Sequence, residues 1–190
     1  PAAVVAGNVE TSQHVTNALF GALGALAASQ GSMNNLTFGN ETYQYYETIC
    51  SGSAAGVLND GTGFNGADGV HVHMTNSRLT DPEILEFRFP VVLEDFHIRR
   101  GSGGRGKFHS GGGTTRTIRF REDMDCAILS SHRTIRPHGL AGGEAGEMGR
   151  TEVRRLNGSV EVLPGCAQTS LKAGEAVTVL TPTGGGYGKA

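Results

Sequence analysis

The chain has 190 residues, 37% of them hydrophobic, which is enough for one well-buried domain. Its 16 Lys and Arg residues are offset by 18 Asp and Glu residues, so the net charge of -2 gives no field that would attract nucleic acid or an anionic membrane, and we expect neither as a partner. The cysteines Cys50, Cys126 and Cys166 are far apart and outside any CxxC spacing, which favours reduced thiols and a cytoplasmic location.

A helix is predicted to begin at Thr11 or Ser12 and to end near Gly31, which is the natural C-cap. The apolar residues follow the i, i+4, i+7, i+8, i+11 spacing of one helix face: Val15, Leu19, Ala22, Leu23 and Leu26. We therefore expect a helix that packs its stripe into the core. The longest apolar run, residues 18–28, is too short for the ~20 residues that a membrane span needs.

The stretch GSMNNLTFGN, residues 31–40, places Asn34, Asn35 and Thr37 directly after this helix. One interpretation is that the asparagines satisfy the last helical carbonyls or form Asx turns. The other is that paired amides offer donors and acceptors to a neutral cyclic amide or imide. Both interpretations remain open on these residues alone.

Strands are predicted along most of the remaining chain, with a long loop at 51–69. Their ranges are 42–49, 69–74, 85–89, 91–99, 115–120, 126–131, 152–156, 159–163 and 176–180. Residues 156–159, Leu-Asn-Gly-Ser, are typical of a type I′ hairpin turn. The expected fold is α+β: one β-rich domain, residues 1–190, of many short strands with one prominent amino-terminal helix.

The stretch DGVHVHMTNSR, residues 68–78, is the one richest in chemical groups. In a strand, His71 and His73 would point to one face and could share a metal or contact a polar substrate, with Asp68 or Asn76 nearby. The alternative is that both imidazoles hydrogen-bond to neighbouring loops. With no third ligand fixed by the spacing, no metal site is assigned here.

The 30 glycines gather in GSGGRGKFHSGGG, GLAGGEAGEMG and TPTGGGYG. None of these clusters has the Lys-Ser/Thr ending of a phosphate loop or a predicted helix after it, as a dinucleotide site requires. We therefore predict that they are tight turns and bulges that connect strands.

Several motifs taken together carry a family resemblance. They run in order from Gly7 to Gly188: GNVETSQ, ASQGSMNNLTFG, YYETI, DGVHVHMTNSR, SGGRGKFHSGGG, GLAGGEAGEMGR and TPTGGGYG. In this order they resemble the carboxy-terminal part of the hydantoinase B/oxoprolinase family. Because the chain also begins with Pro1 rather than Met, we expect it to be a carboxy-terminal fragment of a larger subunit.

The resemblance implies an ATP-dependent cyclic-amide hydrolase that opens 5-oxoproline or a hydantoin. In that family an A-type ATPase subunit or domain phosphorylates the amide oxygen, and the B-type part adds water. ATP and a divalent metal are implied for the whole enzyme and neither is expected on this fragment, because the family's metal ligands lie upstream. The fragment alone is expected to be inactive, and the whole enzyme to be oligomeric.

Under this resemblance, the substrate-binding candidates are Asn34, Asn35, Thr37, His71, His73 and Asn76, and we expect both asparagines to share one concavity with the histidines and Asn76. Two other functions stay open. One is the α subunit of an acetone-carboxylase-type enzyme, and the other is a non-catalytic assembly domain for the ATPase partner.

Overall fold

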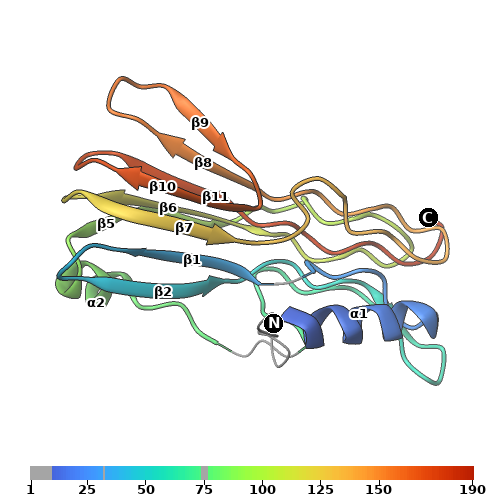
Figure 1. Cartoon of the computed structure of the whole chain (residues 1–190). Coiled ribbons are helices and arrows are strands. Elements are labelled where there is room, and N and C mark those ends of the chain that lie inside the picture. The colour runs from blue at the N-terminus through green and yellow to red at the C-terminus, as the bar shows by residue number, and fades with distance from the viewer. Residues whose placement is uncertain (1–9, 32, 74–76) are drawn as a thin grey trace, which may run out of the picture.

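A computed structural model describes residues 10–31, 33–73 and 77–190 (Figure 1). Within these ranges it contains the helices α1 (Ser12–Ala22) and α2 (Pro82–Arg88). The strands are β1 (Asn34–Gly39), β2 (Gln44–Ile49), β3 (Gly56–Val57), β4 (Gly63–Phe64), β5 (Val91–Ile98), β6 (Thr114–Phe120), β7 (Met124–Leu129), β8 (Arg150–Arg154), β9 (Val160–Leu163), β10 (Cys166–Leu171) and β11 (Ala176–Leu180). The predicted β-rich α+β class is confirmed, and no described helix is long and apolar enough to cross a membrane.

Two antiparallel sheets form the body of the fold, one ordered β10-β7-β1-β2 and the other β5-β6-β11-β8-β9 (Figure 1). Alternate residues of each strand face the partner sheet, so Leu36 and Phe38 of β1 share one hydrophobic core with Ile118 of β6. The rings of Phe38 and Phe120 pack edge to face with centroids 5.2 Å apart. This core fixes the orientation of β1 and β2. The candidate site lies at the start of β1 and at the end of β2.

Helix α1 differs from the prediction in its length and in the face it buries. It ends at Ala22 because Gly24 adopts a φ of +70° and the Ala25 N–H donates to Phe20 O, the pattern of a Schellman C-cap. Val15, Leu19 and Leu23 are 60%, 58% and 70% exposed. The expectation of a core helix is therefore wrong for the described chain, which leaves the apolar stripe open to solvent.

Four other predicted segments have a different structure. Residues 85–89 belong to α2, which begins at Pro82 and whose N-cap Asp81 accepts a hydrogen bond from Glu83 N. The predicted strand 69–74 does not form in its described part, residues 69–73, where Val70 alone pairs, in an isolated β-bridge with Ser51. The predicted turn at 34–35 is the start of β1. In the hairpin turn after β8 only Gly158 has a positive φ, so the turn is not type I′.

The glycine clusters form a bundle of extended segments that continues beyond the sheets (Figure 1). Ala55 N donates to Gly185 O, Gly104 N to Gly184 O, and Gly186 N to Glu144 O, so segments far apart in sequence bond directly through their backbones. A Cβ at Gly143 would overlap the backbone of Gly186. The prediction of turns and bulges is therefore wrong for most of these glycines, which are required because backbones approach closely.

Candidate functional site

The two predicted substrate amides lie side by side at the start of β1. Asn34 is paired with Ile49 of β2, and Asn35 with Thr48. Because successive side chains in a strand point to opposite faces, Asn34 shares the core face with Leu36, whereas Asn35 lies on the outer face. The two amides therefore do not form one paired surface.

The Asn34 side chain is 1% exposed, and its amide is fully used inside the protein. Its Nδ2 donates to Gln30 Oε1 at 3.1 Å and to Ile49 O at 3.4 Å. Its Oδ1 accepts from Nη1 and Nη2 of Arg133, both at 3.2 Å. An amide has two N–H donors and two lone pairs, so Asn34 has no capacity left for a ligand in this arrangement.

Asn35 has a similar structural role on the outer face of the sheet. Its Nδ2 donates to Glu10 Oε1 at 3.1 Å, and its Oδ1 accepts from Tyr46 OH at 3.0 Å and Thr48 Oγ1 at 3.1 Å. These bonds tie Glu10, two residues before the first residue of α1, to both β1 and β2. Asn35 thus fixes where the helix begins relative to the sheet.

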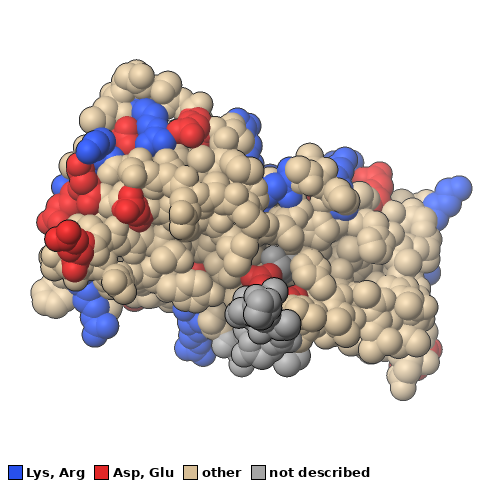
Figure 2. Space-filling view, viewed as in Figure 1, with Lys and Arg blue, Asp and Glu red and all other residues tan. Residues whose placement is uncertain are grey.

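Thr37 is the next outer residue of β1, and it is exposed. It lines an open groove of about 1020 Å³ that runs over β1, β7 and β10. Figure 2 shows charged side chains at the end away from α1 and others along the upper edge of the molecule. The lining of the groove includes Glu41, Asp123, Asp125 and Lys172. His71 lines a different cavity, which does not include Thr37. These two predicted residues therefore lie on separate surfaces.

His71 lines a smaller cavity of about 320 Å³ at the edge of the sandwich. The cavity lies where β2 and β5 end, and its lining residues are Cys50, Gly69, His71, Ser77, Arg78, Leu79, Phe96, Ile98 and Thr114. Nδ1 and Nε2 of His71 are both buried and have no hydrogen-bond partner among the described residues. Burial lowers the pKa of His71, so at neutral pH its ring is uncharged and offers one donor and one acceptor.

His73 lies apart from this lining and packs against α1. Its ring centroid is 5.8 Å from that of Phe20, its backbone has a φ of +53°, and burial lowers its pKa. Since residues 71–73 do not form a strand, the geometry expected of a shared metal site is missing. No group of three or more His, Cys, Asp or Glu side chains in the described ranges could hold a metal ion, and Asn76 lies outside those ranges.

A buried ion pair that the sequence analysis missed lies beside the cavity. Arg116 Nε and Nη2 donate to the two carboxylate oxygens of Glu47 at 2.7 and 2.9 Å, and Tyr45 OH donates to the same carboxylate at 2.9 Å. The Arg116 guanidinium stacks 5.2 Å from the ring centroid of Phe96, which lines the cavity. The alternation of Arg116 with Ile118 in TTRTIRF was the available signal, because it places the arginine on the core face.

The groups around the cavity are suited to binding rather than to covalent chemistry. Burial raises the pKa of the Cys50 thiol, which therefore stays protonated at neutral pH. Burial, followed by the Glu47 charge, raises the pKa of Tyr45 to about 12. An apolar wall of Phe96, Ile98 and Leu79 with one uncharged imidazole can hold a small ring that has a polar edge.

Comparison with known proteins gives matches over almost the whole chain. A sequence profile of the Hydantoinase B/oxoprolinase family matches residues 1–190. The chain is 46% identical to "5-oxoprolinase" of Dictyostelium discoideum and 47% identical to "5-oxoprolinase 1" of Arabidopsis thaliana, in each case over 98% of this chain and 14% of the relative. It therefore spans about one seventh of the length of these relatives.

Two solved structures share the fold. An ATP-dependent caprolactamase from Pseudomonas jessenii has a TM-score of 0.68 at 22% identity, over 87% of this chain and 30% of that one. A nucleotide-free acetone carboxylase has a TM-score of 0.66 at 16% identity, over 84% and 26%. The resemblance inferred from the ordered motifs is confirmed by the match along the whole chain. The protein accordingly belongs to the hydantoinase B/oxoprolinase family.

Proposed function

We propose that this chain is part of an ATP-dependent enzyme that opens the ring of a cyclic amide, 5-oxoproline or a hydantoin. The observation that carries the proposal is the identity of 46% and 47%, over 98% of the chain, to proteins named 5-oxoprolinase. Since the chain spans 14% of those relatives, the complete activity belongs to a larger assembly.

The chemistry explains why such an enzyme is divided into parts. A lactam carbonyl is a poor electrophile, and transfer of a phosphoryl group from ATP to its oxygen turns that oxygen into a leaving group, while a divalent metal stabilises the developing charge. We assign the phosphorylation to a hydantoinase A-type subunit or domain. ATP and metal would then bind outside this chain, whose glycine clusters form the packed bundle described above.

Within this chain we propose that the His71 cavity receives part of the substrate ring. An uncharged imidazole can donate to a carbonyl oxygen or accept from an amide N–H, and the apolar wall suits ring methylenes. Asn34 and Asn35 then act as positioning residues, because their amides hold β1 against β2 and α1. His73 and Thr37 remain candidates for contacts to parts of the enzyme or substrate on other faces.

A second candidate function is assembly. It is favoured by the uncharged helix α1, whose apolar stripe is open to solvent in the described chain. An assembly domain would be needed for association with the ATPase partner, but none of its side chains would affect substrate affinity.

The test uses the complete enzyme with its A-type partner, ATP and 5-oxoproline, and measures ADP and ring-opened product. We expect no turnover by the 190-residue chain alone. In the complete enzyme, His71→Ala should lower kcat/KM about tenfold or more, the effect of losing one buried hydrogen bond to substrate, whereas His97→Ala, at an exposed histidine, should not change it.

Three results would contradict this proposal: turnover by the chain alone, normal kcat/KM in His71→Ala, or loss of partner association as the sole effect of that change. The last result would favour the assembly function.

A further inference from the structure

Arg133, in the segment after β7, is a half-buried arginine whose hydrogen bonds to described residues all go to neutral groups. Its Nη1 and Nη2 donate to Asn34 Oδ1, both at 3.2 Å, and Nη1 also donates to Ser131 O at 2.9 Å. Its Nε is buried and has no partner among the described residues. A guanidinium with an unused buried donor is a strong candidate for binding an anion.

The other arginines of this chain that are not exposed all have an acidic partner. The pairs are Arg99 with Glu147, Arg116 with Glu47, Arg119 with Glu94, and Arg155 with Glu161 and Glu175. Arg133 has no such pair in the described ranges. Residues 1–9, 32 and 74–76, which the structure does not describe, contain no Asp or Glu. Therefore no acidic side chain of this chain is available to Arg133.

Asn34, which accepts from Arg133, also links it to Gln30 in the segment before β1. Gln30 is fully buried and accepts from Asn34 through Oε1, while its Nε2 has no partner in the described part of the chain. The Ser29 hydroxyl is also buried without a partner there. Burial alone lowers the pKa of Arg133 to about 10, so the group is still a cation at neutral pH. A desolvated cation is stabilised by a negatively charged acceptor.

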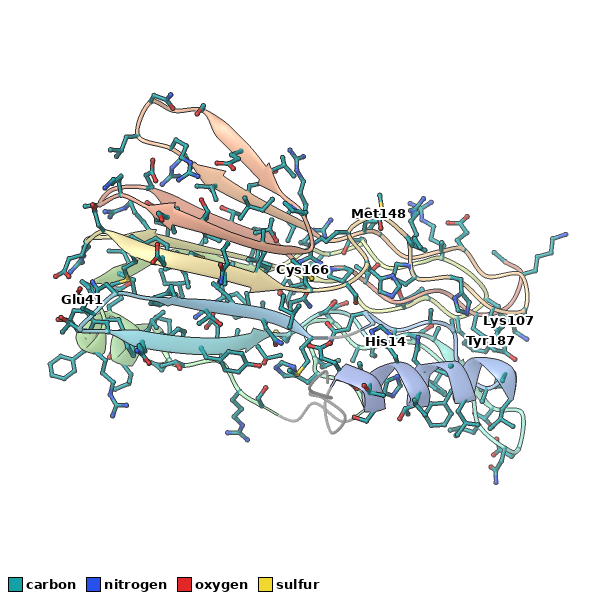
Figure 3. All side chains as sticks on the ribbon, viewed as in Figure 1. His14, Glu41, Lys107, Met148, Cys166 and Tyr187 are labelled. Carbon is teal, nitrogen blue, oxygen red and sulfur yellow. The ribbon has the colours of Figure 1, made fainter. Side chains whose placement is uncertain are left out.

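Arg133 lies next to the surface at the junction of the sheets and the glycine-rich bundle. A Cβ added to Gly149 would overlap its guanidinium, and one at Gly165 would touch its side chain at 3.4 Å. The chain neighbours of these glycines, Met148 and Cys166, are exposed and are labelled at this junction in Figure 3. Arg133 is itself only half-buried, so part of its side chain reaches solvent at this junction, although its Nε does not.

We propose that Arg133 binds a carboxylate supplied from outside this chain. Its oxygens would accept from Arg133 Nε and from the donors next to Asn34, which would complete the network. The carboxylate could belong to a substrate that carries one on its ring, such as 5-oxoproline, and this source rests on the proposed function. The other source is an Asp or Glu side chain in the rest of the enzyme.

The first arm of the test is a titration of the 190-residue chain without ATP, so that it is independent of ring opening. Sodium 5-oxoproline and 2-pyrrolidinone, which is the same ring without the carboxylate, are added at constant ionic strength while the Arg133 Nε–H signal is followed by NMR. We expect a saturable shift with 5-oxoproline alone. Arg133→Met should weaken this binding about tenfold or more, and Arg119→Met, at an arginine paired within the chain, should leave it unchanged.

The second arm compares the loss of melting temperature caused by Arg133→Met in the chain and in the complete enzyme. A larger loss in the enzyme, without a shift in the titration, assigns the carboxylate to another part of the enzyme. Arg119→Met should give the same loss in both, because Glu94 lies within this chain. No saturable shift together with equal losses would overturn the proposal and leave Arg133 as a hydrogen-bond donor to Asn34.

Discussion

Glu47 and Arg116 place two opposite charges between the hydrophobic faces of the sheets, where their side chains are 3% and 1% exposed. Two direct hydrogen bonds and the Tyr45 hydroxyl satisfy the carboxylate. Such a pair gives little net stability compared with apolar residues of the same shape, but removing one partner leaves a buried charge alone.

Glu47→Gln should therefore lower the free energy of unfolding by about 3–5 kcal/mol, measured by urea denaturation. Glu152→Gln, which breaks the more exposed pair with Arg150, should lower it by less than ~1 kcal/mol. Adding Arg116→Met to Glu47→Gln should restore much of the loss, because the unpaired charge is removed. Equal small losses for the two single variants would show that Arg116 is not desolvated as described.

The His71 cavity makes stability depend on pH. Burial lowers the pKa of His71 in the folded chain below the value of ~6.5 expected in the unfolded chain. Between the two values the unfolded chain binds more protons, so the folded state is fully stable above about pH 6.5 and loses stability as pH falls through the lower folded pKa.

Urea denaturation at pH 7.5 and 5.5 should show this loss, and His71→Phe should reduce it by removing the titrating group. His73 and His132, whose pKa values burial also lowers, should account for part of the remaining loss. An unchanged loss in His71→Phe would mean that the ring is protonated without penalty in the folded chain.

The sequence predicted residue types for the candidate site but not the faces on which they lie. Asn34 and Asn35 were expected in a turn after the helix, whereas they start β1 opposite the end of β2, where the strand alternation sends one amide into the core and the other outward. Arg133 has no local signal, because what distinguishes it is the lack of an acidic neighbour in three dimensions. Such information depends on tertiary contacts that periodicity does not encode.

At the scale of elements, α1 shows how a correct pattern can lead to a wrong environment. Its apolar spacing is that of a buried stripe, but in the described chain the stripe faces solvent. Helix α1 also carries no acidic residue in its first turn and no basic residue in its last turn. The helix thus contributes little to the hydrophobic core of the described chain.

Leu19→Lys combined with Leu23→Lys should leave the free energy of unfolding within ~0.5 kcal/mol of the original and reduce the binding of a hydrophobic dye. Leu36→Ala, in the core, should lower it by about 2–5 kcal/mol. If the double lysine variant were as unstable as Leu36→Ala, the stripe would be packed in solution.

Most strands were predictable because their residues alternate or are β-branched, as in β6 and β11. Residues 85–89 were misassigned as a strand although Asp81 and Pro82 form a helix start, a stronger signal than the apolar residues that follow. Strand β10 was missed because Cys166–Leu171 is mostly polar and half open to solvent. For β10 the local preference was weak, and pairing with β7 decided the structure.

The whole molecule combines two kinds of packing. The sheets are held by side chains in a shared core, whereas the glycine-rich bundle is held by backbone contacts between segments with almost no side chains between them. Glycine content predicted turns here because turns are its commonest use, and the close packing of extended backbones gives no distinct pattern along the sequence.

Gly143→Ala should destabilise the bundle by about 1–3 kcal/mol or more, because the new methyl group would overlap the backbone of Gly186, which cannot rotate away. Gly21→Ala in α1, where the nearest atom to the new methyl is His138 Nε2 at 3.9 Å, should be neutral or stabilising. Urea denaturation of both variants tests this, and similar stabilities would mean that the bundle is loosely packed.

The order in which the bundle's segments are synthesised has a consequence for how the protein matures. Ala55 N donates to Gly185 O, and Gly104 N donates to Gly184 O. During synthesis these donors therefore leave the ribosome before their acceptors near residue 185 exist. Until then those backbone groups are solvated, and the bundle cannot close around them. A nascent chain that stops before this segment should therefore be cut readily by protease at 51–69, while the released chain resists it.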